Sequence, residues 1–325
     1  MIIYEFKEGQ GLGNQLWCYF SLLNISKETN HKFKVANHKE FKAKSFLKIQ
    51  TKEYQGDLKN LQLLKECEFY DYENDYYSSS FDGYLIEYLK KNVEKEFLIE
   101  GLFQSEKYFF DNDLTHQIQI EFNNEVESLD FDNTCVLNIR GGEYKKHSKF
   151  NLQIEYWKQC IEIMKAEHGV SRFIIVTDDI RYTTRLLPDI ETLNLSVEQC
   201  FQVLFNCKYF ILSNSTFSYF PISLANKTTK RAIIAPAYFS RPYNKNKLWC
   251  SPCNVYRDWN YYDCIYQRIL TTEEIKSSVS KTLIHYAENL NLRIKDSRSK
   301  NTSQFKRLIK WALLPILKKL FPLKF

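Results

Sequence analysis

Apolar runs typical of strands alternate with helical runs along much of this 325-residue chain, and that order constrains its fold more than any other feature. The alternation is clearest after residue 130. There the sequence predicts strands over 135–139, 172–179, 209–215 and 231–239, and helices over 156–168, 180–187, 196–207 and 216–226. Strands that alternate with helices form βαβ units, whose strands lie parallel in a sheet.

The first part of the chain shows the same order less regularly. We expect a strand over 2–6, a helix over 14–30, and strands over 32–37 and 96–103. The pattern becomes regular after 125–133, and a chain of this length forms about two domains. The sequence therefore predicts two α/β domains with parallel sheets, over residues 1–130 and 131–296, followed by a tail over 297–325.

A glycine-rich loop follows the first predicted strand. Three of the nine glycines of the chain lie within five positions there, directly before Asn14 and Gln15. Glycine lets the backbone turn tightly and approach another group closely. The loop lacks the Lys-Ser/Thr pair that completes a nucleoside-triphosphate-binding loop. It therefore predicts a tight strand-to-helix turn, in which Asn14 can cap the helix.

Polar loops follow four of the predicted strands: "KEGQGLGNQ" (7–15), "RGGEYKKH" (140–147), "TDD" (177–179) and "SNSTFS" (213–218). In open α/β sheets, ligands bind at the carboxyl ends of the strands. We therefore expect these loops to converge on one rim and to form the functional site.

Arg140 is the residue of these loops best suited to bind a charged ligand. A guanidinium group at a strand end can hold a diphosphate with two donors at once. The glycines that follow, Gly141 and Gly142, allow the backbone to come close to the phosphates. The alternative is a surface turn whose arginine pairs with a neighbouring carboxylate.

The other two loops have a structural and a functional interpretation each. Ser213 or Ser215 can cap the helix that follows, and the exposed N–H groups there can bind an anion. Asp178 or Asp179 can cap the helix over 180–187, or can accept a hydrogen bond from a base or sugar hydroxyl. Neither aspartate suits Mg²⁺ or Mn²⁺, which require further carboxylates or phosphates, so we expect no metal.

Three segments, "GQGLGNQLW" (9–17), "NIRGGEY" (138–144) and "SNSTFSYFPISL" (213–224), resemble in order and spacing the motifs of the bacterial α-1,2-fucosyltransferases of glycosyltransferase family 11. That family shows GGLGNQMFQ, then HxRRGDY, then NSSFSWW. The resemblance spans roughly residues 5–240. It implies a GT-B-like fold, in which two Rossmann-type domains face a cleft. It also implies GDP-fucose as the donor, held by the second domain without a metal, and a glycan hydroxyl, such as the 2-hydroxyl of galactose, as the acceptor.

In the expected displacement reaction, Arg140 stabilises the charge that builds on the β-phosphate. A carboxylate accepts the proton of the acceptor hydroxyl, and the candidates are Glu8, beside the glycine-rich loop, and Glu143, which could equally form a salt bridge that orients Arg140. The residues expected at the donor are Gly11, Gly13, Asn14, Gln15, Asn138, Gly141, Asp178, Asp179, Ser213, Asn214, Ser215 and Thr216.

The chain departs from the family pattern at three positions of the arginine motif. Asn138 stands at the histidine, Gly141 at the second arginine and Glu143 at the aspartate. Arg140 then neutralises the diphosphate alone, unless Lys145, Lys146 or Arg241 contributes. Two alternatives follow: a transferase that uses another nucleotide sugar, and a catalytically inactive relative that binds glycan or nucleotide at a membrane. A nucleotide-dependent oxidoreductase is disfavoured, since Leu16 stands where a third glycine or alanine is expected.

The positive charge of the chain is concentrated in its tail. Residues 297–325 hold eight basic and no acidic residues, which leaves 37 basic against 39 acidic residues before them. This distribution argues against nucleic acid as a partner. The segment 305–325 combines leucines with lysines and predicts a helix that lies on an anionic membrane, although it could also dock on the protein or form a dimer contact.

The sequence predicts a cytoplasmic protein held on the cytoplasmic face of the membrane. The start of the chain shows no signal peptide, and no run is apolar and long enough to span a bilayer. The nine cysteines are odd in number and most lie in apolar runs, which favours buried thiols over a disulfide framework. A lipid-linked acceptor glycan would fit this location.

Overall fold

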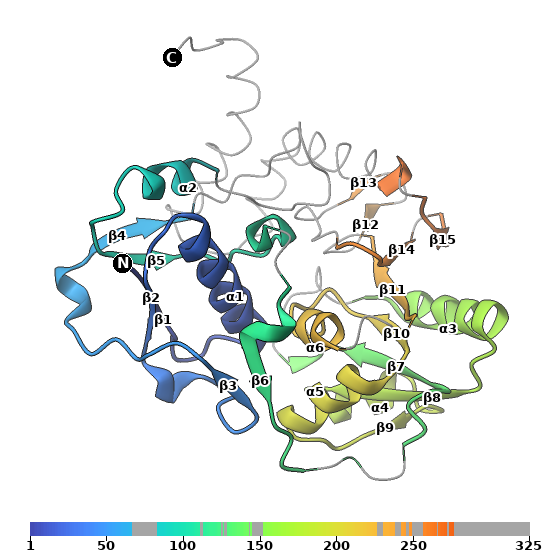
Figure 1. Cartoon of the computed structure of the whole chain (residues 1–325). Helices are drawn as coiled ribbons and strands as arrows, with labels where there is room; N and C mark the ends of the chain where they lie inside the picture. The colour runs from blue at the N-terminus through green and yellow to red at the C-terminus, as the bar shows by residue number, and fades with distance from the viewer. Residues whose placement is uncertain are drawn as a thin grey trace, which may run out of the picture.

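The computed structural model describes residues 1–66, 83–110, 113–124, 126, 129–142, 144, 152–225, 230–237, 242–244, 247–248, 256–264, 266–271 and 273–275. These residues form two separate parallel sheets with helices packed against them (Figure 1). The predicted pair of Rossmann-type α/β sheets is confirmed. The tail over 297–325 lies outside the described residues. In the part of the chain that the structure describes, no helix is long and apolar enough to cross a membrane.

The first sheet has four parallel strands in the order β2, β1, β5, β4. They are β1 (Ile2–Glu5), β2 (Phe33–Ala36), β4 (Gln62–Lys65) and β5 (Phe97–Glu100), and the helices of this part are α1 (Leu12–Glu28) and α2 (Gly83–Lys90). Three strands and α1 were predicted. The sequence analysis missed β4, because its residues are largely exposed and do not form an apolar run.

The second sheet has the order β15, β14, β11, β10, β7, β8, β9, in which only β15 is antiparallel to its neighbour. Its strands are β7 (Thr134–Ile139), β8 (Arg172–Thr177), β9 (Glu191–Thr192), β10 (Tyr209–Leu212), β11 (Ala232–Pro236), β14 (Asn260–Asp263) and β15 (Arg268–Ile269). Its helices are α3 (Ile154–His168), α4 (Ile180–Leu186), α5 (Val197–Asn206) and α6 (Tyr219–Leu224). The predicted strands and helices of this half are all present, with shifted ends.

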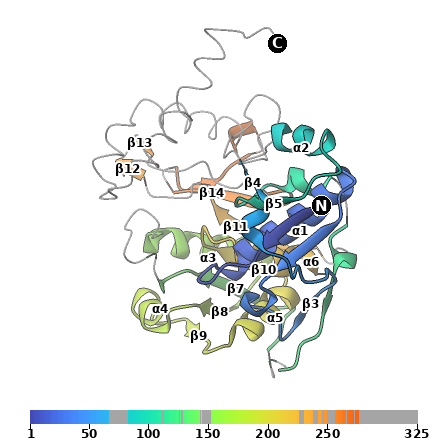
Figure 2. The same cartoon turned by 90° about the vertical axis from the view of Figure 1, so that its left-hand side faces the viewer.

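Helices cover both faces of the second sheet (Figure 2). Cys135, Leu137 and Ile139 of β7 pack with α3 and α4, whereas Val136 packs with α5 and α6. Successive side chains of a strand point to opposite faces, so a strand buried on both sides is apolar at most positions. This explains why Cys135, Val136, Leu137 and Ile139 of β7 are apolar, and only Thr134 and Asn138 are polar. Helix α3 ends at His168, and its C-cap Gly169 has a φ of 66°, a left-handed conformation that favours glycine.

Short elements complete the described chain. Strands β3 (Leu47–Ile49) and β6 (Ile118–Ile120) pair antiparallel, as do β12 (Pro242–Asn244) and β13 (Lys247–Leu248). Four 3₁₀ helices lie at His38–Glu40, Leu58–Asn60, Glu106–Phe109 and Thr115–Gln117. None of these was predicted, because elements of two to four residues have too little periodicity to recognise.

One aromatic core joins the two halves of the chain. The ring of Trp17 in α1 lies 4.4 Å from Tyr219 and 5.1 Å from Phe220, both in α6, and 5.3 Å from Phe109. Helices α1 and α6 lie side by side in both views (Figures 1 and 2). Helix α1 is therefore buried between its own sheet and the second half. The predicted division at residue 130 stays a prediction.

Candidate functional site

Three of the four polar loops meet at one edge of the second sheet. Strands β10, β7 and β8 are neighbours and run parallel, so their carboxyl ends lie at the same edge. Hydrogen bonds join segment 140–144, after β7, to the loop 178–179 after β8 and to the loop 213–216 after β10. The expected convergence of these three loops is confirmed.

Arg140 and Asp178 form an ion pair at the centre of this edge. Nη1 of Arg140 lies 2.6 Å from Oδ2 of Asp178, and the two side chains are 34% and 28% exposed. The other oxygen, Oδ1, accepts a hydrogen bond of 2.7 Å from the backbone N–H of Gly141. One carboxylate thus holds both the guanidinium group and the turn that follows it. The pairing matches the alternative interpretation of Arg140, and it leaves a third of the arginine side chain accessible.

Two glycines allow the arginine turn to lie on the aspartate loop. A Cβ atom on Gly141 would lie 2.6 Å from the Cβ of Asp179, and one on Gly142 would lie 2.5 Å from Oδ2 of Asp178. Gly142 also has a φ of +28°, which favours glycine. Position 141 therefore has no room for the second arginine of the family motif unless the loop 178–179 moves.

Asp179 has a structural role in this arrangement. Its Oδ1 accepts the N–H of Tyr182 at 3.1 Å and caps α4, which confirms one of the roles that the sequence offered. Asp178 and Asp179 are adjacent, yet they hold different elements: the first holds the arginine turn and the second begins the next helix.

The loop after β10 approaches Arg140 from the other side. The Tyr144 hydroxyl donates to the carbonyl of Asn214 at 3.3 Å, and the Arg140 guanidinium carbon lies 5.6 Å from the centre of the Tyr144 ring. Ser213 is 5% exposed, and its buried hydroxyl has no hydrogen-bond partner among the described residues. A buried hydroxyl without a partner at a strand end is able to bond a ligand.

Asn138 and Ser215 hold the protein itself. Asn138 is 6% exposed and donates from its amide to the carbonyl of Val176 at 3.4 Å, which ties β7 to β8. Oγ of Ser215 accepts the N–H of Phe217 within a turn at 3.3 Å. Helix α6 begins after Ser218 without a side-chain cap, so the prediction that Ser213 or Ser215 caps it is wrong.

The glycine-rich loop reaches the same region from the first half of the chain. A Cβ atom on Gly13 would lie 2.5 Å from the carbonyl carbon of Thr216. Oδ1 of Asn14 accepts hydrogen bonds from the Thr216 hydroxyl and from the Gln104 amide, each at 2.9 Å. Gly13 is thus needed for a close approach between the first turn of α1 and the loop 213–216. The N-cap residue of α1 is Gly11, so the prediction that Asn14 caps this helix is wrong.

Gln15 and Glu8 differ in burial: Gln15 is fully buried and Glu8 is exposed. Gln15 has no exposed surface, donates to the carbonyl of Glu40 at 2.8 Å and accepts from the N–H of Lys42 at 3.0 Å. Both ends of its amide therefore hold the segment 40–42. Glu8 is exposed in the loop before α1. Glu143, Lys145, Lys146 and Arg241 lie outside the described residues.

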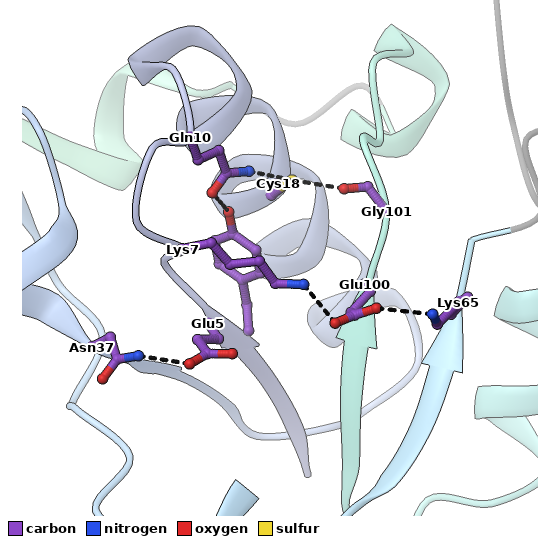
Figure 3. A network of polar contacts seen from close by, with 9 residues as sticks. Glu5, Lys7, Gln10, Cys18, Asn37, Lys65, Glu100 and Gly101 are labelled. Atoms are coloured by element: carbon purple, nitrogen blue, oxygen red, sulfur yellow. Dashed lines mark hydrogen bonds and ion pairs between the residues drawn. The ribbon is translucent and has the colours of Figure 1, made fainter. Parts of the chain in front are cut away.

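Polar side chains that sequence reasoning missed lie at the carboxyl edge of the first sheet (Figure 3). Asn37, after β2, donates to Oε1 of Glu5 in β1 at 2.6 Å. Glu100, at the end of β5, lies 2.5 Å from Nζ of Lys7 and 3.3 Å from Nζ of Lys65. The hydrogen bond from Lys7 is the main reason why the pKa of Glu100 is lowered. Their position at the last residue of a strand or soon after it was the available signal.

A second chain of contacts anchors the glycine-rich loop (Figure 3). The Tyr4 hydroxyl donates to Oε1 of Gln10 at 2.8 Å, and the Gln10 amide lies 3.8 Å from the sulfur of Cys18. That thiol contacts the carbonyl of Gly101 at 3.3 Å. Burial raises the pKa of Tyr4 and raises the pKa of Cys18 to about 12, so both stay protonated donors at neutral pH.

Glu66, which the sequence analysis also missed, orders the loop after β5. It is 4% exposed, and its Oε2 accepts the N–H groups of Leu102 and Phe103 at 2.9 and 2.8 Å. Its Oε1 accepts from the Tyr108 hydroxyl at 2.7 Å. These bonds place Gln104, the second partner of Asn14.

Cysteines and metal ligands add no further site among the residues that the structure describes. Five of the six described cysteines are buried thiols, as expected: Cys18, Cys135, Cys160, Cys200 and Cys207. Cys67, Cys250 and Cys253 lie outside those residues. Within the described ranges, no group of three or more His, Cys, Asp or Glu side chains could hold a metal ion.

Residues 3–263 match the model of the family described as Glycosyl transferase family 11. No curated protein matches the sequence.

Several solved glycosyltransferase structures resemble the chain at low identity. The α-1,6-fucosyltransferase NodZ, co-crystallised with GDP, is 13% identical with a TM-score of 0.40, over 69% of this chain and 92% of that one. POFUT1 in complex with GDP-fucose is 11% identical with a TM-score of 0.43, over 71% and 96%. The E. coli heptosyltransferase WaaC with ADP is 11% identical with a TM-score of 0.44, over 86% and 99%.

Proposed function

Because the chain belongs to glycosyl transferase family 11, it is a glycosyltransferase, and we propose that it transfers L-fucose from GDP-fucose to a hydroxyl group of a glycan. The acceptor that we propose is the 2-hydroxyl of a galactose in a bacterial surface glycan that is linked to a lipid. The observation that carries the proposal is the position of Arg140. It lies in the arginine motif, at the carboxyl end of β7, where three polar loops meet.

The donor diphosphate is the ligand that this edge suits best. The Arg140 guanidinium can donate two hydrogen bonds to phosphate oxygens. The buried hydroxyl of Ser213, which has no partner within the described ranges, can add a third. The first turn of α1 has no acidic residue and lies against Thr216, so its N–H groups favour negative charge at the same place.

The proposed reaction is a direct displacement with inversion. The acceptor oxygen forms a bond to the anomeric carbon of fucose while the bond from that carbon to the β-phosphate oxygen breaks. GDP leaves with the electron pair, and the acceptor proton passes to a carboxylate. Arg140 stabilises the charge that grows on the β-phosphate. Glu8, which is exposed near α1, and Glu143 are the candidates for the proton acceptor.

The carboxyl edge of the first sheet is the proposed acceptor side. Glu5, Asn37 and Glu100 lie there with Lys7 (Figure 3), and carboxylate and amide groups of this kind bond sugar hydroxyls with their remaining lone pairs and N–H groups. The glycine-rich loop connects this edge to α1, which contacts the donor edge through Asn14.

Two further parts of the proposal concern conditions and place. Transfer needs no metal, so activity should persist in excess EDTA. Loss of activity on chelation, with recovery when Mn²⁺ is added, would overturn this part.

The protein works on the cytoplasmic face of the membrane, held there by the basic segment 305–325.

The test is a donor and acceptor screen with the purified full-length chain. GDP release is measured with GDP-fucose and a galactose-terminated acceptor, alongside GDP-mannose, UDP-, dTDP- and CMP-sugars, and the product linkage is read by NMR. Release that needs both GDP-fucose and the acceptor, with an α-1,2 product, supports the proposal. Turnover of another nucleotide sugar would replace the donor, and GDP binding without any turnover would favour an inactive relative.

A further inference from the structure

Asp178 pairs with the guanidinium group of Arg140, to which the proposed function assigns the donor diphosphate. Its two oxygens hold Nη1 of Arg140 at 2.6 Å and the N–H of Gly141 at 2.7 Å. A diphosphate oxygen needs the same guanidinium donors, so carboxylate and phosphate compete for them.

The surroundings keep this pair in one geometry. The Tyr144 ring lies beside the guanidinium group, and its hydroxyl bonds the backbone of Asn214. A Cβ on Gly142 would meet Oδ2 of Asp178 at 2.5 Å, so the carboxylate lies directly against the backbone. The arginine is therefore paired with the loop after β8 and lies beside Tyr144, whose hydroxyl bonds the loop after β10.

The charge balance is the second observation. The family motif has two arginines, and this chain has Arg140 and Gly141. A side chain at 141 is blocked by Asp179, whose Cβ would lie 2.6 Å away. In this turn the charge of Arg140 is therefore offset by Asp178, and an incoming diphosphate meets a neutral pair.

We propose that Asp178 is a positioning residue that holds the Arg140 guanidinium group in place for the diphosphate and gives it up when the donor binds. The inference rests on the proposed function, because it needs a nucleoside diphosphate at Arg140. The carboxylate weakens nucleotide binding, since its negative charge repels phosphate. It also speeds transfer, since a pre-positioned arginine loses less freedom in reaching the transition state.

A purely structural role makes a different prediction. An aspartate that only holds the turn would, when neutralised, lower stability and weaken nucleotide binding together. A positioning carboxylate that competes with phosphate would instead bind GDP more tightly when neutralised, while turnover falls. The two effects have opposite signs.

The test compares D178N with wild type in the full-length chain. Asparagine has the shape of aspartate and retains an acceptor for the Gly141 N–H group. GDP affinity is measured by calorimetry, and kcat and KM are measured with GDP-fucose. We expect GDP to bind roughly tenfold more tightly to D178N, from the loss of one close negative charge. We expect kcat to fall about tenfold or more, from the looser arginine.

E191Q is the matched control. Glu191 pairs with Arg172, which begins β8, so this substitution removes an exposed arginine pair at the opposite end of the strand that Asp178 follows. It should change neither GDP affinity nor kcat.

D178A is the second variant. It also removes the negative charge, so we expect tighter GDP binding even where the turn is less stable. Thermal unfolding checks that each variant folds.

The outcomes separate the inference from the proposed function. Equal or weaker GDP binding by folded D178N and D178A, or an unchanged kcat in D178N, would overturn the role of Asp178. Unchanged GDP binding in R140A would overturn the donor site and the inference with it. Tighter GDP binding by D178N in a protein that does not turn over GDP-fucose would support the competition with phosphate and overturn only the proposed donor sugar.

Discussion

The side-chain oxygen of Asn14 accepts a hydrogen bond of 2.9 Å from the hydroxyl of Thr216, which lies 202 residues further along the chain. The same oxygen accepts from Gln104. Three segments of the chain therefore meet at one carboxamide: the first turn of α1, the loop after β5 and the loop after β10. This contact joins the glycine-rich loop to the candidate donor edge.

The contact predicts an energetic coupling between Asn14 and Thr216. N14A and T216V should each destabilise the protein by about 1 kcal/mol, the net worth of a typical hydrogen bond. The double variant should lose less stability than the sum of the two single losses, and the difference, the coupling energy, should be about 0.5–1 kcal/mol. Urea unfolding of the four proteins measures it, and full additivity would contradict the contact.

Gly13 should not tolerate a side chain. In G13A the new methyl carbon would lie only 2.5–2.6 Å from the carbonyl carbon and oxygen of Thr216. Helix α1 or the loop must therefore move. We expect a loss of about 1–3 kcal/mol, as in other overpacked sites, together with weaker nucleotide binding.

The matched control for G13A is G11A, two residues earlier. A Cβ at position 11 meets nothing within 4 Å, and the φ of Gly11 is −67°, which any residue adopts. Its expected cost is about 0.5 kcal/mol, from an alanine in the N-cap position. Equal losses in the two variants, by urea unfolding, would show that the close approach to Thr216 has no cost of its own.

R140A should abolish transfer while the protein stays folded. Removal of a donor that stabilises transition-state charge lowers the rate by ~10²-fold or more. The fold should survive because the side chain is at a strand end and 34% exposed. Steady-state kinetics measure the loss, R172A at the other end of β8 is the control, and wild-type kcat/KM in R140A would refute the assignment.

The pair of Glu100 with Lys7 predicts a small, pH-dependent contribution to stability. The pKa of Glu100 is lowered in the folded protein, chiefly by the hydrogen bond from Lys7. Its contribution is therefore complete above the unfolded pKa, near 4.5, and is lost as the pH falls from there through the lowered pKa of the folded protein. Because the pair is partly exposed, the contribution is no more than about 1 kcal/mol.

The measurement is urea unfolding of wild type and E100Q at pH 7 and at pH 3. The difference between the two proteins should be present at pH 7 and should shrink at pH 3, which lies below the pKa of this carboxyl group in the unfolded chain. A difference that grows at low pH would contradict the sign.

The segment 305–325, outside the described residues, should bind anionic membranes. Full-length protein should float with anionic vesicles, should bind less as the salt concentration rises, and should lose binding when truncated after Asp296. Transfer to a small soluble acceptor should survive this truncation. Equal flotation of the truncated protein would place the membrane contact elsewhere, and failure of the full-length protein to float would leave the segment as a packing element.

Much of the fold follows from local patterns. Four of the five residues of "CVLNI" are apolar because β7 is covered on both faces, and Gly169 ends α3 because the left-handed conformation favours glycine. Strand order at one edge then brings the loops after β7, β8 and β10 together. The exposed strand β4 and the pair β3–β6 lacked such patterns, since short or solvent-exposed strands need few apolar residues.

The roles of individual site residues depended on contacts between distant segments. The motif identified Arg140, but nothing local showed that Asp178 pairs with it, because that pair joins loops after two different strands. The sequence explained Gly13 by a tight turn, whereas the structure requires glycine there because the residue packs closely against Thr216. Gln15 appeared beside Asn14 as a donor ligand, yet it is fully buried against the segment 40–42. The local sequence indicates which residues form strands, helices and turns. The contact partner of each residue is decided by packing between segments, and such partners lie up to 202 residues apart in the chain.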